Sequence, residues 1–202
     1  IEGNPKLRII PIVKPVRRGQ SQYSSEIIVR KDSGIEHIAD LAGKKLACVD
    51  TESTAGYLLA AAHLVRAGIP VNDPLLSHPH FLHQYGNVVL SVLFGKYDAG
   101  AVFEGAPAIF LKDREESRRD EIRVLAKSAP VPYEPITAIV GGALSEARAV
   151  EIQKSFLELN ADSQILKKLQ VNGFVEATQK EYDPIRNIVA TVRRIPAARD
   201  VK

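Results

Sequence analysis

The sequence has one cysteine, no tryptophan, no methionine and only 6% aromatic residues in 202 positions. A disulfide needs two thiols, so Cys48 cannot form one within the chain, and its apolar strand-like surroundings indicate a buried thiol. Long hydrophobic runs are also lacking, since no stretch reaches the roughly 18 apolar residues typical of a membrane helix. Residues 1–6 have no signal-peptide pattern, so we expect soluble material in which any signal or lipid anchor is absent.

Strong charge of one sign is absent too. The formal net charge is +3, and acidic and basic residues alternate through segments such as residues 112–121, which indicates a solvated surface. The only concentrated basic segment is short, at residues 14–18. Binding to nucleic-acid phosphates normally needs a longer basic stripe, so we expect no nucleic-acid partner.

Recognised catalytic motifs are not found. The sequence has no nucleophile motif joining serine, histidine and an acid, no Walker-type loop and no glycine fingerprint after a strand. His78, His80 and His83 could suggest zinc, but no cysteine or carboxylate completes a known ligand spacing. We therefore expect a binding protein, not an enzyme, without cofactor or metal.

Alternating strand and helix patterns predict an α/β fold. Apolar runs predict strands at residues 25–30, 46–49, 99–103, 122–126 and 136–140. Helical spacing predicts helices at about residues 54–67 and 86–94, and three more beginning near Ser145, Asp162 or Ser163, and Asp183. This order favours parallel or mixed sheets covered by helices, with ligands at the carboxyl ends of strands.

The pattern also suggests two lobes. Two extended segments, residues 25–30 and 135–140, bracket a central block and would act as hinge strands. We predict that residues 34–126 form an inserted second lobe, and that residues 1–33 and 127–202 form a discontinuous, partial first lobe.

Residues 50–57, Asp-Thr-Glu-Ser-Thr-Ala-Gly-Tyr, follow a predicted strand and open a predicted helix. The first amides of a helix have no intrahelical acceptor and carry partial positive charge, and serine or threonine hydroxyls can donate beside them. This arrangement could hold a tetrahedral oxyanion. The alternative is that Ser53 or Thr54 only caps the helix.

Several motifs, in order, resemble the substrate-binding proteins of phosphate, phosphite and phosphonate ABC transporters, which have the type 2 periplasmic-binding-protein fold. The matching segments are residues 23–35 (Tyr-Ser-Ser-Glu-Ile-Ile-Val-Arg-Lys-Asp-Ser-Gly-Ile), 40–45, 53–57, 86–89, 95–101 and 182–186. The resemblance implies two α/β lobes joined by two hinge strands, a small oxyanion in the cleft between them, and a membrane permease as partner.

The resemblance also implies ligand-binding roles for Ser53, Thr54, Ala55 and Gly56. The family usually has Ser-Thr-Ser-Gly here, so Ala55 removes one hydroxyl donor and leaves its amide. A neutral hydrogen bond contributes roughly 0.5–1.5 kcal/mol, and one to a charged group contributes more, so ligand choice or affinity would change.

Of two aromatic residues at cleft positions of the family, Tyr23 matches the family pattern and Tyr85 departs from it, although Tyr85 or His83 could still donate to an anion. Tyr23 matches an aromatic that lines the cleft, although a tyrosine at a strand end can also simply pack half-buried. The family commonly has a histidine just before the helix that begins near Gly86, and alignment on Val88 places Tyr85 there, with His83 two residues earlier.

Glu104 and Glu134 fall near places where the family has acidic cleft residues. A carboxylate beside an oxyanion favours ligands that bring a proton or an amino group, such as protonated phosphonate, phosphite or aminoalkyl forms. The alternative for both is an exposed surface glutamate.

The family has several strand-helix units before the segment that resembles residues 7–13, so we expect the N-terminal part of the first lobe to be missing from this chain. An exposed sheet edge would then favour a dimer. We expect a periplasmic or extracytoplasmic transport protein. The alternatives are a ligand-sensing domain of a kinase, chemoreceptor or cyclase, and the effector domain of a transcription regulator, which would need a helix-turn-helix that the sequence does not show.

Overall fold

The computed structural model describes residues 6–69 and 80–193. The chain divides into two compact units, one made of residues 1–23 and 131–185 and the other of residues 24–130 and 186–202. The predicted boundary at residue 33 lies beyond strand β3 (Ser25–Arg30), whereas the observed division falls before this strand. The reason is that β3 is hydrogen-bonded on both sides within the second unit.

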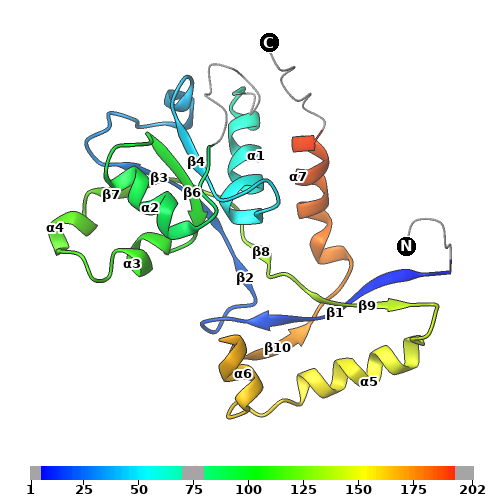
Figure 1. Cartoon of the computed structure of the whole chain (residues 1–202). Coiled ribbons are helices and arrows are strands. Elements are labelled where there is room, and N and C mark those ends of the chain that lie inside the picture. Colours follow the sequence, from blue (N-terminus) through cyan, green and yellow to red (C-terminus); the bar gives the residue numbers. More distant parts are fainter. Residues whose placement is uncertain (1–5, 70–79, 194–202) are drawn as a thin grey trace. The chain divides into compact units, whose positions relative to one another are not determined.

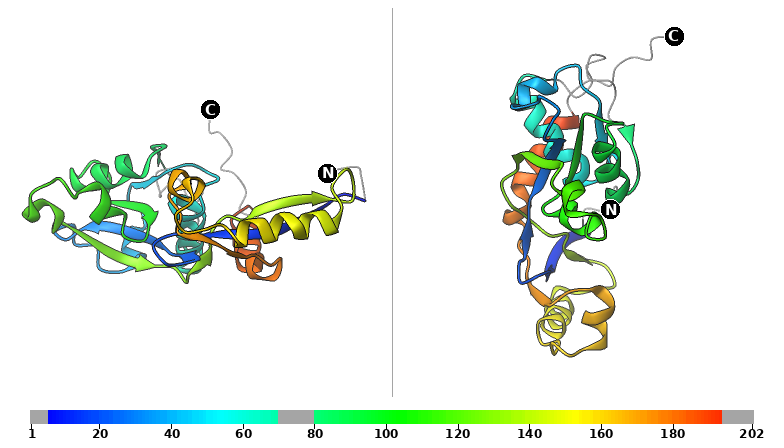
Figure 2. Two further views of the ribbon diagram at one scale, coloured as in Figure 1. Left: turned by 90° about the horizontal axis from the view of Figure 1, so that it is seen from below. Right: turned by 90° about the vertical axis from the view of Figure 1, so that its left-hand side faces the viewer.

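The first unit is built on an antiparallel sheet in the order β10-β1-β9. One face of this sheet carries helix α5, whose Ala149, Ile152 and Phe156 pack with the strands in one core cluster. Figure 2 shows α5, in yellow, running alongside these strands. The elements are β1 (Arg8–Val16), β2 (Gln22–Tyr23), β8 (Val131–Pro132), β9 (Ile136–Val140), α5 (Glu146–Leu157), α6 (Gln164–Leu169), β10 (Gly173–Glu176) and the 3-10 helix η3 (Lys180–Tyr182).

The second unit is built on a five-stranded mixed sheet in the order β5-β4-β6-β3-β7. Its further elements are η1 (Ile38–Leu41), β4 (Leu46–Cys48), the π-helix η2 (Thr54–Leu58), α1 (Leu59–Arg66), β5 (His80–Phe81), α2 (Tyr85–Leu93), β6 (Ala99–Phe103), α3 (Ala106–Phe110), α4 (Glu116–Arg119) and β7 (Ile122–Lys127). Figure 1 shows α1 and α2 beside β4 and β6.

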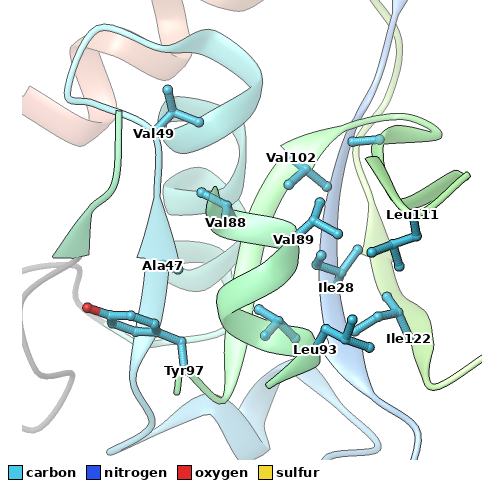
Figure 3. Packing of buried hydrophobic residues seen from close by; sticks show 12 residues of the cluster. Ile28, Ala47, Val49, Val88, Val89, Leu93, Tyr97, Val102, Leu111 and Ile122 are labelled. Carbon is cyan, nitrogen blue, oxygen red and sulfur yellow. The ribbon is translucent and has the colours of Figure 1, made fainter. Parts of the chain in front are cut away.

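Helices cover both faces of this sheet. On one face Ala60 and Leu64 of α1 pack with Leu41 of η1 against the strands. On the other, Val88, Val89 and Leu93 of α2 meet the strand residues Ile28 and Val102, together with Leu111 and Ile122, as Figure 3 shows. Near-continuous burial of β3 and β6 follows, because both faces of each strand are covered.

Helix α7 (Asp183–Arg193) begins among residues of the first unit and continues into the second. Its Ile188, Val189 and Val192 pack with Leu58 of η2 and Ala61 of α1. The predicted helix start at Asp183-Pro184 is confirmed, as are the starts after the caps Ser145 and Ser163.

Gly100 allows α2 to approach the sheet. A Cβ atom added at this position would lie 2.7 Å from Val88 Cγ1 and 3.0 Å from Val92 Cγ2, and both valines are fully buried. We expect Gly100→Ala to lower the free energy of unfolding by about 1–3 kcal/mol through overpacking. Chemical denaturation of Gly100→Ala, Val88→Ala and the double variant measures this. The double variant should lose less than the sum of the two single losses, and strict additivity would contradict the close packing.

Candidate functional site

Four strands of the five-stranded sheet end at the same edge. β5 and β6 are both parallel to β4, and β7 runs antiparallel to β3, which is itself antiparallel to β6. The chain therefore leaves β4, β5, β6 and β7 on the side where β3 begins. This edge carries the segment that follows β4, the Glu104 turn after β6, Lys127 at the end of β7 and Ser25 at the start of β3. It is the place where α/β sheets commonly bind ligands.

The segment after β4 forms a capped helical turn. Ser53 is the N-cap of η2, and its Oγ accepts a hydrogen bond from the Gly56 amide at 3.1 Å. The Ser53 carbonyl accepts from the Leu58 amide at 3.0 Å, the wide spacing of a π-helical turn. Ser53 and Thr54 are half-buried, while Ala55 and Gly56 are buried. The helix-cap role expected as an alternative is therefore present, and the sequence did not predict the π-helix.

Gly56 is required by packing. An added Cβ atom would lie 2.5 Å from Val49 Cγ2 and 2.8 Å from Ser53 Oγ. The Gly56 carbonyl accepts from the Val49 amide at 3.1 Å, so the turn folds back on the end of its own strand. We name residues 53–56 the cradle.

A residue that sequence reasoning missed, Ser25 at the start of β3, holds the cradle from across the sheet, since β6 lies between β3 and β4. Ser25 is 2% exposed, and its Oγ donates to the Ala55 carbonyl at 2.6 Å. The Ser25 amide in turn donates to Ser128 Oγ at 2.9 Å. The peptide that joins Ala55 and Gly56 is thus held at its carbonyl by Ser25 and at its amide by Ser53. The sequence signal was a serine pair, Ser24 and Ser25, at the start of a buried strand.

Tyr85, the first residue of α2, reaches the cradle. Its Oη lies 3.0 Å from Ser53 Oγ, and either hydroxyl can donate in this contact. The Tyr85 ring meets the Phe103 ring edge-on with centroids 4.8 Å apart. The structure therefore brings Tyr85, which alignment places where the family commonly has a histidine, together with Ser53. His83, two residues before Tyr85, is exposed.

Glu104 is exposed at the end of β6 and is paired. Lys127 Nζ lies 2.5 Å from its Oε1. Nearby Glu26 is 7% exposed, and its Oε2 accepts from the Gly105 amide at 3.1 Å. Burial raises the pKa of the Glu26 carboxyl, the Gly105 hydrogen bond lowers it, and the charge of Glu104 raises it further.

The two remaining predicted residues lie in the first unit and contact each other. Tyr23 Oη donates to Glu134 Oε1 at 3.1 Å, and the Tyr23 ring stacks on Tyr133 at 4.8 Å. The Tyr133 carbonyl accepts from Tyr182 Oη at 2.9 Å, and burial raises the pKa of that phenol. Tyr182 thus fixes the segment that carries Glu134. Glu134 itself is exposed.

Metal binding finds no support in the described residues. Within residues 6–69 and 80–193, no three side chains of histidine, cysteine, aspartate or glutamate gather as a metal site would need. His78 lies outside these residues, and the His80 ring contacts Tyr97, with centroids 5.1 Å apart. Among the described helices, none combines the length and the apolar character of a membrane span.

The fold and the groups at the carboxyl edge of the sheet are those of a binding protein. Comparison of the sequence with known protein families identifies the family. Residues 3–182 match the family described as ABC transporter, phosphonate, periplasmic substrate-binding protein, and the chain belongs to this family. That family consists of solute-binding transport components, which are generally non-enzymatic.

The chain is also similar to two curated proteins and to a solved structure. The phosphate-import protein PhnD of Mycolicibacterium smegmatis is 22% identical over 84% of this chain and 58% of its own length. The tetrathionate sensor histidine kinase TtrS of Salmonella typhimurium is 27% identical over 65% of this chain and 23% of its own length. PhnD1 from Prochlorococcus marinus, solved in complex with methylphosphonate, has a TM-score of 0.69 at 19% identity, covering 95% of this chain and 73% of that one. The chain thus spans less than two thirds of either curated relative, and the structural likeness confirms the predicted periplasmic-binding-protein fold.

Glu26 gives a test of the electrostatics at this edge. Its raised pKa means that ionising it costs stability in the folded state, so the cost is absent at low pH and appears as the pH rises through the folded-state value. Glutamine stays neutral and can still accept from Gly105. We expect the unfolding free energy of Glu26→Gln, relative to the parent chain, to increase between about pH 4 and about pH 7. Denaturation at both pH values checks this, with the exposed Glu158→Gln as control. An equal or falling difference would contradict it.

Proposed function

We propose that the chain is the solute-binding component of an ABC transporter and holds a phosphonate, phosphite or phosphate-type oxyanion at the cradle. The observation that carries this proposal is the cradle itself, where Ser53 and Thr54 stand at the start of the continuous helical segment formed by η2 and α1. Helix starts favour anions because their amides and dipole present positive charge. Ser53 and Tyr85 add two hydroxyls 3.0 Å apart.

Family membership and the relatives support the ligand class. The family description names phosphonate, one relative is a phosphate-import protein, and PhnD1 was solved with methylphosphonate. The proposed contacts are Ser53, Thr54, Ala55, Gly56 and Tyr85. We also propose Glu104 as a ligand contact. Tyr23 and Glu134, which share a hydrogen bond, are proposed as further contacts because of the family resemblance. A periplasmic or extracytoplasmic location and a permease partner follow from the same proposal.

Sensing in a signalling protein is the second candidate function. The likeness to the TtrS sensor kinase over 65% of this chain favours it. The two functions share the binding step and differ in the partner. Tetrathionate, a sulfur oxyanion, therefore belongs in any titration panel, and its selective binding would favour the sensor.

Removing the Thr54 hydroxyl tests the cradle. Thr54→Val nearly keeps the side-chain shape, and loss of a hydrogen bond to a charged ligand should weaken binding about tenfold or more. Isothermal titration of the full-length protein with phosphate, phosphite, methylphosphonate and aminoethylphosphonate measures this. Thr51→Val, an exposed threonine of the same loop, is the matched control. Unchanged affinity in Thr54→Val would show that the cradle is only a helix cap, and silence toward all four ligands would reject the phosphorus-anion proposal.

Self-association through the three-stranded sheet is part of the proposal. Among the described residues β9 is an outer strand, and Ile9 and Ile139, which are partners across β1 and β9, are 47% and 50% exposed. We expect sedimentation velocity of this chain to show a dimer at high concentration, because exposed apolar outer strands favour pairing. Ile139→Lys should shift the protein to monomer, and Val150→Lys, at an exposed valine of helix α5, should not. A clean monomer of the parent chain would contradict the proposal.

A further inference from the structure

Three charged side chains share one face of the sheet at its carboxyl edge. Glu26 on β3 lies directly opposite Val102 on β6 and opposite Lys127 on β7. Opposite residues in antiparallel strands point to the same face, and so do residues two positions apart in one strand. Glu104, two residues after Val102, therefore joins Glu26 and Lys127 on that face.

The contacts among these groups place two carboxylates beside one ammonium. Lys127 Nζ lies 2.5 Å from Glu104 Oε1, and the two side chains are 48% and 42% exposed. The Glu26 carboxylate is buried and accepts from the Gly105 amide, directly after Glu104. The Glu104 backbone is fixed as well, since its amide donates to the Ser24 carbonyl at 2.9 Å. Glu104 is therefore already matched with a positive charge that the protein supplies.

This pair adjoins the cradle through a short series of contacts. Phe103, the residue before Glu104, packs edge-on against Tyr85, and Tyr85 Oη contacts Ser53 Oγ. Phe103 is also the register partner of Ser25, whose hydroxyl holds the Ala55 carbonyl.

We propose that Lys127 sets the class of ligand by occupying the Glu104 carboxylate, so that the site takes oxyanions without an amino group in preference to aminoalkyl ones. This inference rests on the proposed function, because it takes the oxyanion to lie at the cradle. It changes the role expected for Glu104: the carboxylate that would receive a ligand ammonium receives the Lys127 ammonium instead.

The physical reason is competition between a tethered and a free cation. Lys127 is attached to the neighbouring strand, so its ammonium is present at a high effective concentration beside Glu104. A ligand ammonium must displace it and gains little net energy from doing so. A ligand without an amino group leaves the ion pair intact and presents no cation to desolvate. Selectivity arises from this difference between two ligands and not from the strength of either alone.

The test compares ligands that differ only by the amino group. Ethylphosphonate and 2-aminoethylphosphonate are titrated calorimetrically into the full-length protein, its Lys127→Met variant and its Lys112→Met variant, which makes the same charge change at an exposed position. Ethanesulfonate and 2-aminoethanesulfonate are titrated in parallel. An exposed ion pair contributes little to folding, so Lys127→Met should fold, and its thermal unfolding midpoint verifies this.

We expect the parent protein to prefer ethylphosphonate, and Lys127→Met to shift the affinity ratio toward 2-aminoethylphosphonate by about two- to fivefold, the size expected of an exposed charge pair. Lys112→Met should leave the ratio unchanged. In a Glu104→Gln background, Lys127→Met should no longer shift the ratio, because the shared carboxylate is gone.

An unchanged ratio in Lys127→Met would overturn the proposal, as would equal weakening of both ligands, which would mean that Lys127 contacts the anion directly. Silence toward both phosphonates with binding of the sulfonates would reject phosphonates as the ligands, and the sulfonate ratio would then decide the role of Lys127. Silence toward all four ligands would reject the role of Lys127, whereas the proposed function would be rejected only if phosphate and phosphite also failed to bind.

Discussion

The hydrogen bond from Ser25 to the Ala55 carbonyl is the constraint on which the site depends. It joins the first residue of β3 to the turn after β4, two segments that are not neighbours in the sheet order, since β6 lies between their strands. Both ends of the bond are buried, so loss of the donor would leave a desolvated carbonyl without its partner. Ser53 holds the amide of the same peptide, and the plane of that peptide is thereby fixed. A preformed turn costs less ordering when a ligand binds.

Local signals predicted the position of the cradle, and non-local contacts determined its shape. A strand, a run of small hydroxyl residues and an apolar helical stripe are readable within 20 residues, so β4 and the helix after it were predicted correctly in type. The π-helical start was not, because helical periodicity does not distinguish the first turn of such a helix. Ser25 and Lys127 were also missed: each acts on a residue 23 to 30 positions away through pairing of strands that the sequence does not reveal.

The roles predicted for the acidic residues were limited in the same way, because the sequence does not show which positive charge lies beside each carboxylate. Glu104 was expected near the ligand because the family that the sequence resembles has acidic cleft residues near this position, and the strand predicted before it, β6, is confirmed. Its electrostatic role depends on Lys127, which lies 23 residues away on β7. From the sequence alone Glu104 is a single negative charge. In the folded protein it forms an ion pair with Lys127, close to the buried carboxyl of Glu26. A free Glu104 carboxylate would favour a ligand that carries an ammonium, because the two can form an ion pair. A carboxylate already paired with Lys127 favours a ligand without one.

In the proposed site, Ala55 and Lys127 act on the ligand in the same direction. By the family resemblance Ala55 takes the place of a hydroxyl and removes one donor toward the proposed oxyanion, and in our proposal Lys127 withdraws a carboxylate from any ammonium. Each change removes a hydrogen-bonding partner that a larger, zwitterionic ligand would use, and what remains is the cradle with Ser53, Thr54 and Tyr85. A site with few directional partners favours a compact anion, whose charge interacts with the helix start without further contacts. Selectivity at this edge then depends on interactions that form within the protein before a ligand binds. These are the hydrogen bond from Ser25 to the cradle and the ion pair between Lys127 and Glu104.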